Sequence, residues 1–239
     1  MKNKGIVLLL AGVMCAGCFA ACGEEGGAKG DVTQEQWTAA FENVDYTNLI
    51  VTMNGLTMID GEEESFQEIT AYFNVDKSYQ KSKRKELSED EKSYDIDESE
   101  GYITEIDGVP YVYESSASSW EKRESMSGSS SMLTSNLSVY LDYAMLGFNI
   151  AKYNAKEDVY FMEMNLNQSG AIGKIEIQFK ENSVYRLGYE ATRSYKEEGK
   201  LFSVEVKVSY IFEEVTIDLP DQEGLKALIA EDAGKTEEE

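Results

Sequence analysis

The chain of 239 residues contains no histidine, and all three of its cysteines lie between positions 15 and 22. The lack of histidine excludes hydrolases that use a Ser–His or Cys–His pair. Cys15, Cys18 and Cys22 would need a fourth sulfur or imidazole ligand to form a structural zinc site, and the chain offers none. A redox C-x-x-C pair needs a folded scaffold, whereas this one lies in a segment that we expect to be removed.

Other catalytic patterns are also missing. No Ser-x-x-Lys pair stands at an evident helix start, and the glycine-rich segments lack the spacing of a phosphate-binding loop. Pairs of carboxylates are too common in so acidic a chain to indicate a glycosidase. The segment from Asp95 to Glu100 lacks the glycine and glutamate positions of a calcium loop and is expected to be a solvated acidic loop. We therefore expect no enzyme, no metal and no cofactor.

Positive charge is scarce. Lysine and arginine number 22 against 45 aspartates and glutamates, which gives a net charge of −23. Nucleic-acid binding depends on neutralising phosphates with basic side chains, so this class of partner is excluded. The same charge disfavours docking of the folded domain onto anionic lipid headgroups. Solubility is the simplest consequence of such a charge.

The N-terminus has the layout of a secretory signal. Lys2 and Lys4 precede an uncharged apolar run, Ile6 to Met14, and small residues follow it. The run is far shorter than the about 20 residues that a membrane-spanning helix needs. We expect residues 1–21 to be a signal peptide that directs the protein out of the cytoplasm.

The end of this segment resembles a bacterial lipobox, in which small residues precede a cysteine that becomes acylated. Phe19-Ala20-Ala21-Cys22 fits, and the polar run Gly23-Glu24-Glu25 that follows favours Cys22. Cys18, preceded by Cys15-Ala16-Gly17, is the alternative attachment site. A further alternative is a plain signal peptide that is cleaved without any lipid being attached. The resemblance implies fatty acyl chains such as palmitate on Cys22 and an extracytoplasmic protein anchored to the cell membrane.

The mature chain divides into three parts. Residues 22–31 are glycine-rich and polar, as expected of a flexible tether. Residues 32–230 are enough for one domain with a substantial core. Residues 231–239 are small and acidic and are expected to be a disordered tail.

Helical spacing appears in two places. Thr33 and Gln36 have the form of a capping box, and apolar residues follow at helical spacing, namely Trp37, Ala40, Phe41 and Val44. A second amphipathic helix is expected from the spacing of Leu133, Leu137, Tyr140, Leu141, Ala144 and Phe148. A short closing helix is expected over Asp221 to Ala230.

The rest of the domain alternates with the period of strands. Four consecutive strands are expected around Met162–Leu166, Ile175–Phe179, Tyr185–Ala191 and Val204–Phe212. Asp107-Gly108 predicts a hairpin between Tyr102–Ile106 and Val109–Tyr113, and Asp60-Gly61 a tight turn. Lys81 to Glu98 is either a long solvated hairpin or a mobile loop, and Ser115 to Ser131 a serine-rich loop. The fold class is α+β: one long curved antiparallel sheet, an open half-barrel, with helices covering its apolar face.

The chain has 15 tyrosines, nine phenylalanines and nine methionines. These residues at strand period either fill a packed core or line a cavity for an apolar ligand. Trp37, Phe41, Leu141 and Phe148 are the residues expected to face the space between helices and sheet.

The order of these features resembles small lipoproteins with the lipoprotein-carrier (LolA/LolB-like) fold. The similar parts are the lipobox, the Thr-x-x-Gln-Trp-x-x-x-Phe helix, GYITEIDGVPYVYESSASSWEKR and the late run VEVKVSYIFEEVTIDLP. In that family an unclosed barrel and its helices enclose an apolar cavity for acyl chains. The resemblance implies a lipid or other hydrophobic ligand as partner, and the alternative is an envelope protein-interaction module with a packed core and no ligand.

Overall fold

The computed structural model describes residues 32–88, 93–123, 134, 136–166 and 171–236. The expected signal peptide, both candidate attachment cysteines and the whole expected tether, residues 22–31, lie outside these residues. None of the helices in the described part of the chain combines the length and apolar character needed to cross a bilayer.

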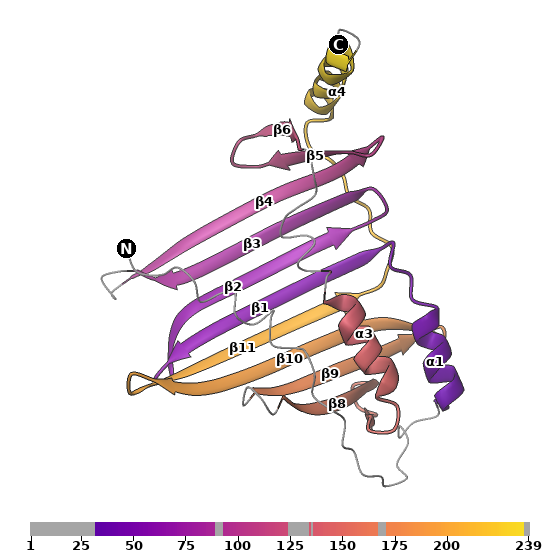
Figure 1. Ribbon diagram of the computed structural model, residues 1–239, viewed down its shortest axis with the longest axis vertical. Coiled ribbons are helices and arrows are strands. Elements are labelled where there is room, and N and C mark those ends of the chain that lie inside the picture. The colour runs from indigo at the N-terminus through magenta and orange to yellow at the C-terminus, as the bar shows by residue number, and fades with distance from the viewer. Residues whose placement is uncertain (1–31, 89–92, 124–133, 135, 167–170, 237–239) are drawn as a thin grey trace.

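The described residues form one antiparallel sheet of eleven strands, in the order β6-β5-β4-β3-β2-β1-β11-β10-β9-β8-β7 (Figure 1). The N-terminal strands are β1 (Leu49–Ile59), β2 (Glu62–Phe73), β3 (Lys77–Leu87), β4 (Tyr94–Ile106), β5 (Val109–Glu114) and β6 (Ser119–Lys122). The C-terminal strands are β7 (Lys152–Asn154), β8 (Val159–Leu166), β9 (Ala171–Lys180), β10 (Ser183–Glu197) and β11 (Lys200–Ile211). The sheet is curved and does not close, so the predicted fold class is confirmed.

The four predicted C-terminal strands are β8 to β11. Their meander joins the N-terminal meander through β1 and β11, which pair from Ile50 opposite Ile211 to Ile59 opposite Phe202. Two-residue turns connect several neighbours. Asp60-Gly61 and Asp107-Gly108 take positive φ at both positions, as the hairpin prediction required.

Within the segment from Lys81 to Glu98, the residues up to Leu87 lie on β3 and those from Tyr94 on β4, and the two strands pair, so the hairpin alternative is the observed one. Lys83 forms an ion pair with Glu98 across the two strands, at 2.9 Å. The expected acidic loop at Asp95 to Glu100 is wrong, because these residues belong to β4. Opposite charges on facing strands allow this polar stretch to remain extended.

The serine-rich segment contains a strand as well. Trp120 lies on β6 opposite Tyr113, is buried, and donates its indole N–H to the carbonyl oxygen of Pro220 at 3.1 Å. The closing helix, α4 (Gln222–Thr236), continues past its expected end at Ala230. Leu225 of α4 packs with Trp120 and Tyr111 in a small second core.

The two faces of the sheet carry different helices. We call the face that bears Val51, Leu187 and Tyr210 the helix face, because α1 (Gln34–Glu42) and α3 (Leu137–Leu146) cover it over the C-terminal strands (Figure 1). The alternation of side chains places Tyr111 and Tyr113 on the opposite face. The third described helix, α4, therefore packs on the opposite side, at the β6 end.

Candidate ligand-binding surface

The four residues expected to face the helix–sheet space come together in the main core. Trp37 is fully buried, Phe41 and Leu141 are buried, and Phe148 is half-buried against them. The Trp37 ring lies 5.8 Å from Phe41 and 5.7 Å from Phe148, measured between ring centroids. It also meets Phe179 of β9 edge-on at 5.2 Å. At this place the space between helices and sheet is filled by aromatic side chains.

Trp37 also joins the two helices. Its indole N–H lies 3.0 Å from the carbonyl oxygen of Met145 and 3.3 Å from that of Ala144, at the end of α3. Thr33 caps α1 through the capping box that the sequence predicts, with Gln36 as its partner. The N-cap fixes where α1 begins and the indole fixes how it lies on α3.

A stacked pair of tyrosines ties α3 to the sheet. The rings of Tyr140 and Tyr189 of β10 lie 4.5 Å apart at 18°. Tyr210 of β11 lies 6.1 Å from Tyr140. Burial raises the pKa of all three phenols above the ordinary value, so the rings are held neutral.

Beyond the helices, the helix face continues along three strands. The register of the strands and the alternation of side chains place nine residues on this part of the face. They are Gly55, Thr57 and Ile59 of β1, Ala191, Arg193 and Tyr195 of β10, and Phe202, Val204 and Val206 of β11. We call these residues the open surface. Ala191 is buried and the others are half-buried. On β2 the same face becomes polar, because Gln67 stands beside Gly55 and Ser65 beside Thr57.

The open surface has room at Gly55. Apart from Gly55 itself and its two neighbours in the chain, no atom of the described residues lies within 4 Å of the position where a Cβ on Gly55 would stand. The backbone there does not need glycine, because its φ is not positive. Val206 is its neighbour on β11. The apolar surface at this point is therefore not covered by another described part of the chain.

A stack of three side chains lies at the far end of the open surface. The guanidinium carbon of Arg193 lies 5.2 Å from the ring centroid of Tyr195. Tyr195 is in turn stacked on Phe202 of β11 at 5.2 Å and 8°. The Nε of Arg193 is buried and has no hydrogen-bond partner among the described residues.

Sequence reasoning did not find Gly55 or Arg193 as site residues. Arg193 stands two residues after Ala191 in the alternation of β10, so the available signal was a charge in an apolar position. The alternation of Tyr185 with Leu187 and Tyr189 in the sequence would place Tyr185 on the apolar face. A register shift between Val184 and Arg186 places Val184 there instead. The Tyr185 hydroxyl instead donates to Glu213 at 3.1 Å.

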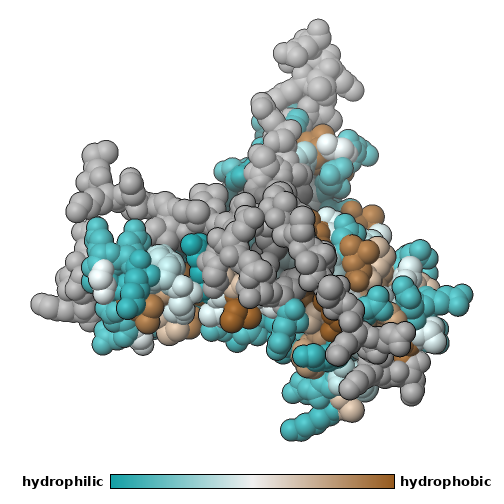
Figure 2. All heavy atoms as spheres, turned by 60° about the horizontal axis from the view of Figure 1, so that its bottom comes forward, coloured by the Kyte–Doolittle hydropathy of each residue, from teal (hydrophilic) through white to brown (hydrophobic). Residues whose placement is uncertain are grey.

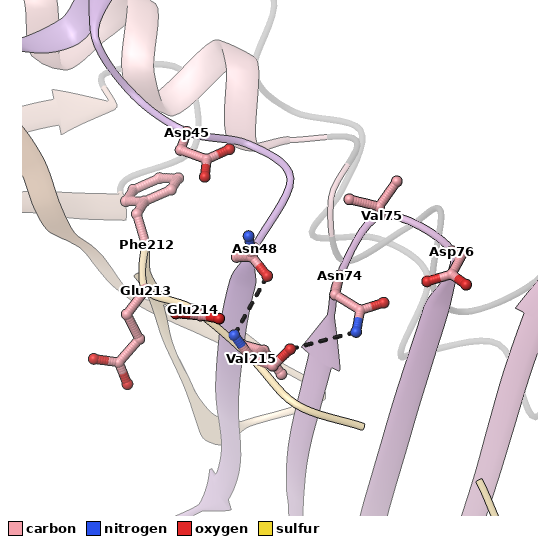
Figure 3. A pocket seen from close by; sticks show the side chains of 9 residues that line it. All are labelled: Asp45, Asn48, Asn74, Val75, Asp76, Phe212, Glu213, Glu214 and Val215. Carbon is pink, nitrogen blue, oxygen red and sulfur yellow. Dashed lines mark hydrogen bonds between the residues drawn. The ribbon is translucent and has the colours of Figure 1, made fainter. Parts of the chain in front are cut away.

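A separate, acidic pocket of about 560 Å³ opens where β11 leads towards α4 (Figure 3). Its lining includes the carboxylates of Asp45, Asp76, Glu213 and Glu214. Hydrogen bonds from the Thr47 hydroxyl and amide lower the pKa of Asp45. This pocket is not the apolar cavity that the sequence suggested.

Two asparagines of this pocket have a structural role. The side-chain N–H of Asn74 donates to the carbonyl oxygen of Val215, and the Val215 N–H donates to the side-chain oxygen of Asn48, both at 3.3 Å (Figure 3). They hold the segment after β11 against the ends of β1 and β2. This segment then leads to α4.

Comparisons with known proteins give little further information. No family model matches the chain, and no curated protein matches it. Among solved structures, the chain is similar to the S-type phycobiliprotein lyase CPES from Guillardia theta, with 7% sequence identity and a TM-score of 0.23. The match covers 78% of this chain and 96% of the lyase. A TM-score of this size does not establish a shared fold.

Proposed function

We propose that this chain is a lipid-anchored extracytoplasmic protein, without enzymatic activity, that binds a hydrophobic molecule on the open surface. The observation that carries the proposal is the uncovered space at Gly55, next to Val206 on the face that elsewhere forms the core. Burying apolar area releases about 25 cal/mol for each Å² removed from water. A ligand lying there would extend the core beyond the helices.

The packing under the helices explains why the ligand is placed beside them and not beneath them. The Trp37 ring has aromatic neighbours from α1, β8 and β9, so a ligand there would have to displace them. Closely packed interiors resist such displacement. The open surface offers apolar contacts without this cost.

The architecture supports the proposal that the chain has the lipoprotein-carrier fold. An unclosed antiparallel sheet with helices on its apolar face is what the resemblance to that family implies, and α1 and α3 lie there, whereas α4 packs on the opposite face. The proposed anchor at Cys22 and the glycine-rich tether would keep the open surface close to a membrane. A hydrophobic ligand could then come from that membrane.

The anchor is tested by mass spectrometry of the N-terminal peptide from membrane fractions. We expect a peptide that begins at Cys22 and carries acyl mass, and we expect its loss in Cys22→Ser but not in Cys18→Ser. An unmodified thiol at position 22 would contradict the proposed attachment site.

The binding surface is tested by titrating the folded protein with a fluorescent long-chain probe. Gly55→Leu places a side chain in the uncovered space and should weaken binding at least about tenfold, the equivalent of about 1.4 kcal/mol. Asn54→Leu is the matched control, because Asn54 is exposed on the opposite face of the same strand. Equal affinities for the wild type and both variants would contradict this site.

A second candidate function is a protein-interaction module. Val75 is 82% exposed at the acidic pocket and Leu146 is 70% exposed at the end of α3. Figure 2 shows hydrophobic atoms in separate patches among hydrophilic ones on the side that it displays. If this second function is the correct one, we expect no bound small molecule and no effect of Gly55→Leu on probe binding. The titration with the fluorescent probe therefore separates the two functions.

A further inference from the structure

We propose that the hydrophobic ligand is an anionic amphiphile, whose carboxylate or phosphate headgroup binds Arg193 while its chain lies on the open surface. This inference rests on the proposed function and names its ligand class. The evidence for it is the position of the Arg193 side chain, the residues around it, and its Nε, which has no hydrogen-bond partner among the described residues.

Arg193 lies on the apolar side of its strand. β10 pairs regularly with β11 from Arg186 to Glu197, so Arg193 points to the same face as Tyr189 and Ala191 of the core. Its cross-strand neighbour on β11 is Val204, and on β9 it is Ala171. An arginine at such a position loses hydration without an obvious gain for folding.

Two lysines of the neighbouring strands β9 and β11 are paired on the opposite face. Lys207 contacts Glu205 at 2.6 Å, and Lys174 contacts Glu176 at the same distance. Among the described residues, Arg193 forms no ion pair, and its buried Nε has no hydrogen-bond partner. Buried polar groups in folded proteins are nearly always hydrogen-bonded, so an unpaired buried donor needs an explanation. A bound anion provides one.

The surroundings of Arg193 suit an anion. The Tyr195 ring, itself stacked on Phe202, supports the guanidinium from one side. Guanidinium groups present parallel N–H donors that match the two oxygens of a carboxylate or a phosphate. The face of an aromatic ring supplies no such oxygens, so this contact leaves the buried Nε of Arg193 without an acceptor in the described part of the chain.

The chain of the amphiphile has a place within reach. Val204 lies directly beside Arg193 on β11, and Thr57 lies opposite Val204 on β1. Gly55 is the next residue of β1 on this face, so its uncovered space is about 10 Å across the sheet from β10, at about 4.8 Å between strands. A single molecule with one charged end can contact both.

The test compares three ligands with the same chain: palmitate, hexadecyl phosphate and the neutral hexadecanol. Their affinities are measured by displacement of a fluorescent probe from the wild type, from Arg193→Gln and from Arg186→Gln. Arg186 is the matched control, because it lies on β10 outside the open surface and donates to Ser209 at 3.1 Å. Thermal unfolding shows whether each variant is folded.

We expect the wild type to bind at least one of the two anions about 10- to 100-fold more tightly than hexadecanol, the range of a hydrogen bond to a charged group. Arg193→Gln should abolish this preference without weakening hexadecanol, and Arg186→Gln should keep it. A preference for palmitate or for hexadecyl phosphate identifies the headgroup.

Equal affinities for the anions and hexadecanol in the wild type would overturn the inference and leave the proposed function standing. This comparison needs no variant, so it decides even if Arg193→Gln does not fold. An anion preference that persists in folded Arg193→Gln would overturn it as well. Failure of all three ligands to bind would contradict the proposed function itself.

Discussion

Trp37 donates its indole N–H to the carbonyl oxygen of Met145, 3.0 Å away and 108 residues later in the chain. This bond joins the first helix to the end of α3, and the indole is also surrounded by aromatic side chains. One fully buried residue therefore links the two helices of this layer to each other. The open surface begins where this layer ends.

Replacing Trp37 with phenylalanine should destabilise the protein by about 2–4 kcal/mol, because it removes a buried hydrogen bond and leaves a cavity. Urea unfolding followed by circular dichroism measures the change. Trp120→Phe is the comparison, since Trp120 holds α4 on the other face, and it should leave the packing of α1 on α3 intact. A cost below about 0.5 kcal/mol for Trp37→Phe would contradict this role of the indole.

Gly147 should not tolerate alanine. A Cβ there would overlap the sulfur of Met162 and lie 2.9 Å from its terminal methyl carbon. Overpacking of this kind costs about 1–3 kcal/mol. The double variant Gly147→Ala/Met162→Ala should be less destabilised than the sum of the two single changes, measured by the same unfolding experiment. Simple additivity would show that the two residues do not compete for space.

The stacked tyrosines predict a loss of stability at alkaline pH. Because burial raises the pKa of Tyr140, Tyr189 and Tyr210, their neutral forms stabilise the fold fully below about pH 10, the ordinary tyrosine pKa. Above it the unfolded chain releases these protons first, so the free energy of unfolding falls as the pH rises.

Tyr140→Phe should reduce this alkaline loss, measured as the slope of unfolding free energy against pH between about 10 and 11, by up to about 1.4 kcal/mol per pH unit. Tyr143→Phe, a change at a half-buried ring of the same helix, is the comparison. An identical slope in the wild type and Tyr140→Phe would be evidence against the burial of this phenol.

Two glycine-to-alanine changes should have different effects. Gly108 has φ of +79° in its hairpin turn, so Gly108→Ala should cost about 1 kcal/mol. Gly55→Ala should be neutral or stabilise by about 0.5 kcal/mol, because its φ is not positive and a Cβ there meets no described atom. Thermal unfolding of both variants checks the contrast, and a destabilised Gly55→Ala would refute the uncovered space.

Much of the fold could be predicted because it depends on short-range patterns. The period-2 alternation of β8 to β11, the Asp107-Gly108 turn and the Thr33 cap are each specified by a few neighbouring residues. The prediction of secondary structure was less complete where contacts with residues far away in the chain determine the local structure. Trp120 lies on a strand because of its contacts with Pro220 and Asp221, about 100 residues away.

The candidate site was harder to predict than the fold. The sequence could indicate that Trp37, Phe41, Leu141 and Phe148 gather under the helices, but not whether rings from β8 and β9 fill the space around them. The open surface depends on where α1 and α3 end above the sheet and on the pairing of Gly55 with Val206. Both are properties of register and tertiary packing, which short-range patterns do not determine.

Native mass spectrometry of the protein purified from its own membranes in mild detergent tests the central claim most directly. We expect a bound hydrophobic molecule, seen as a non-covalent mass in addition to any acyl mass on the chain, in the wild type and in Asn54→Leu. We expect this mass to be absent or strongly reduced in Gly55→Leu. A wild-type protein without a bound molecule, or one retained equally by folded Gly55→Leu, would contradict ligand binding on the open surface.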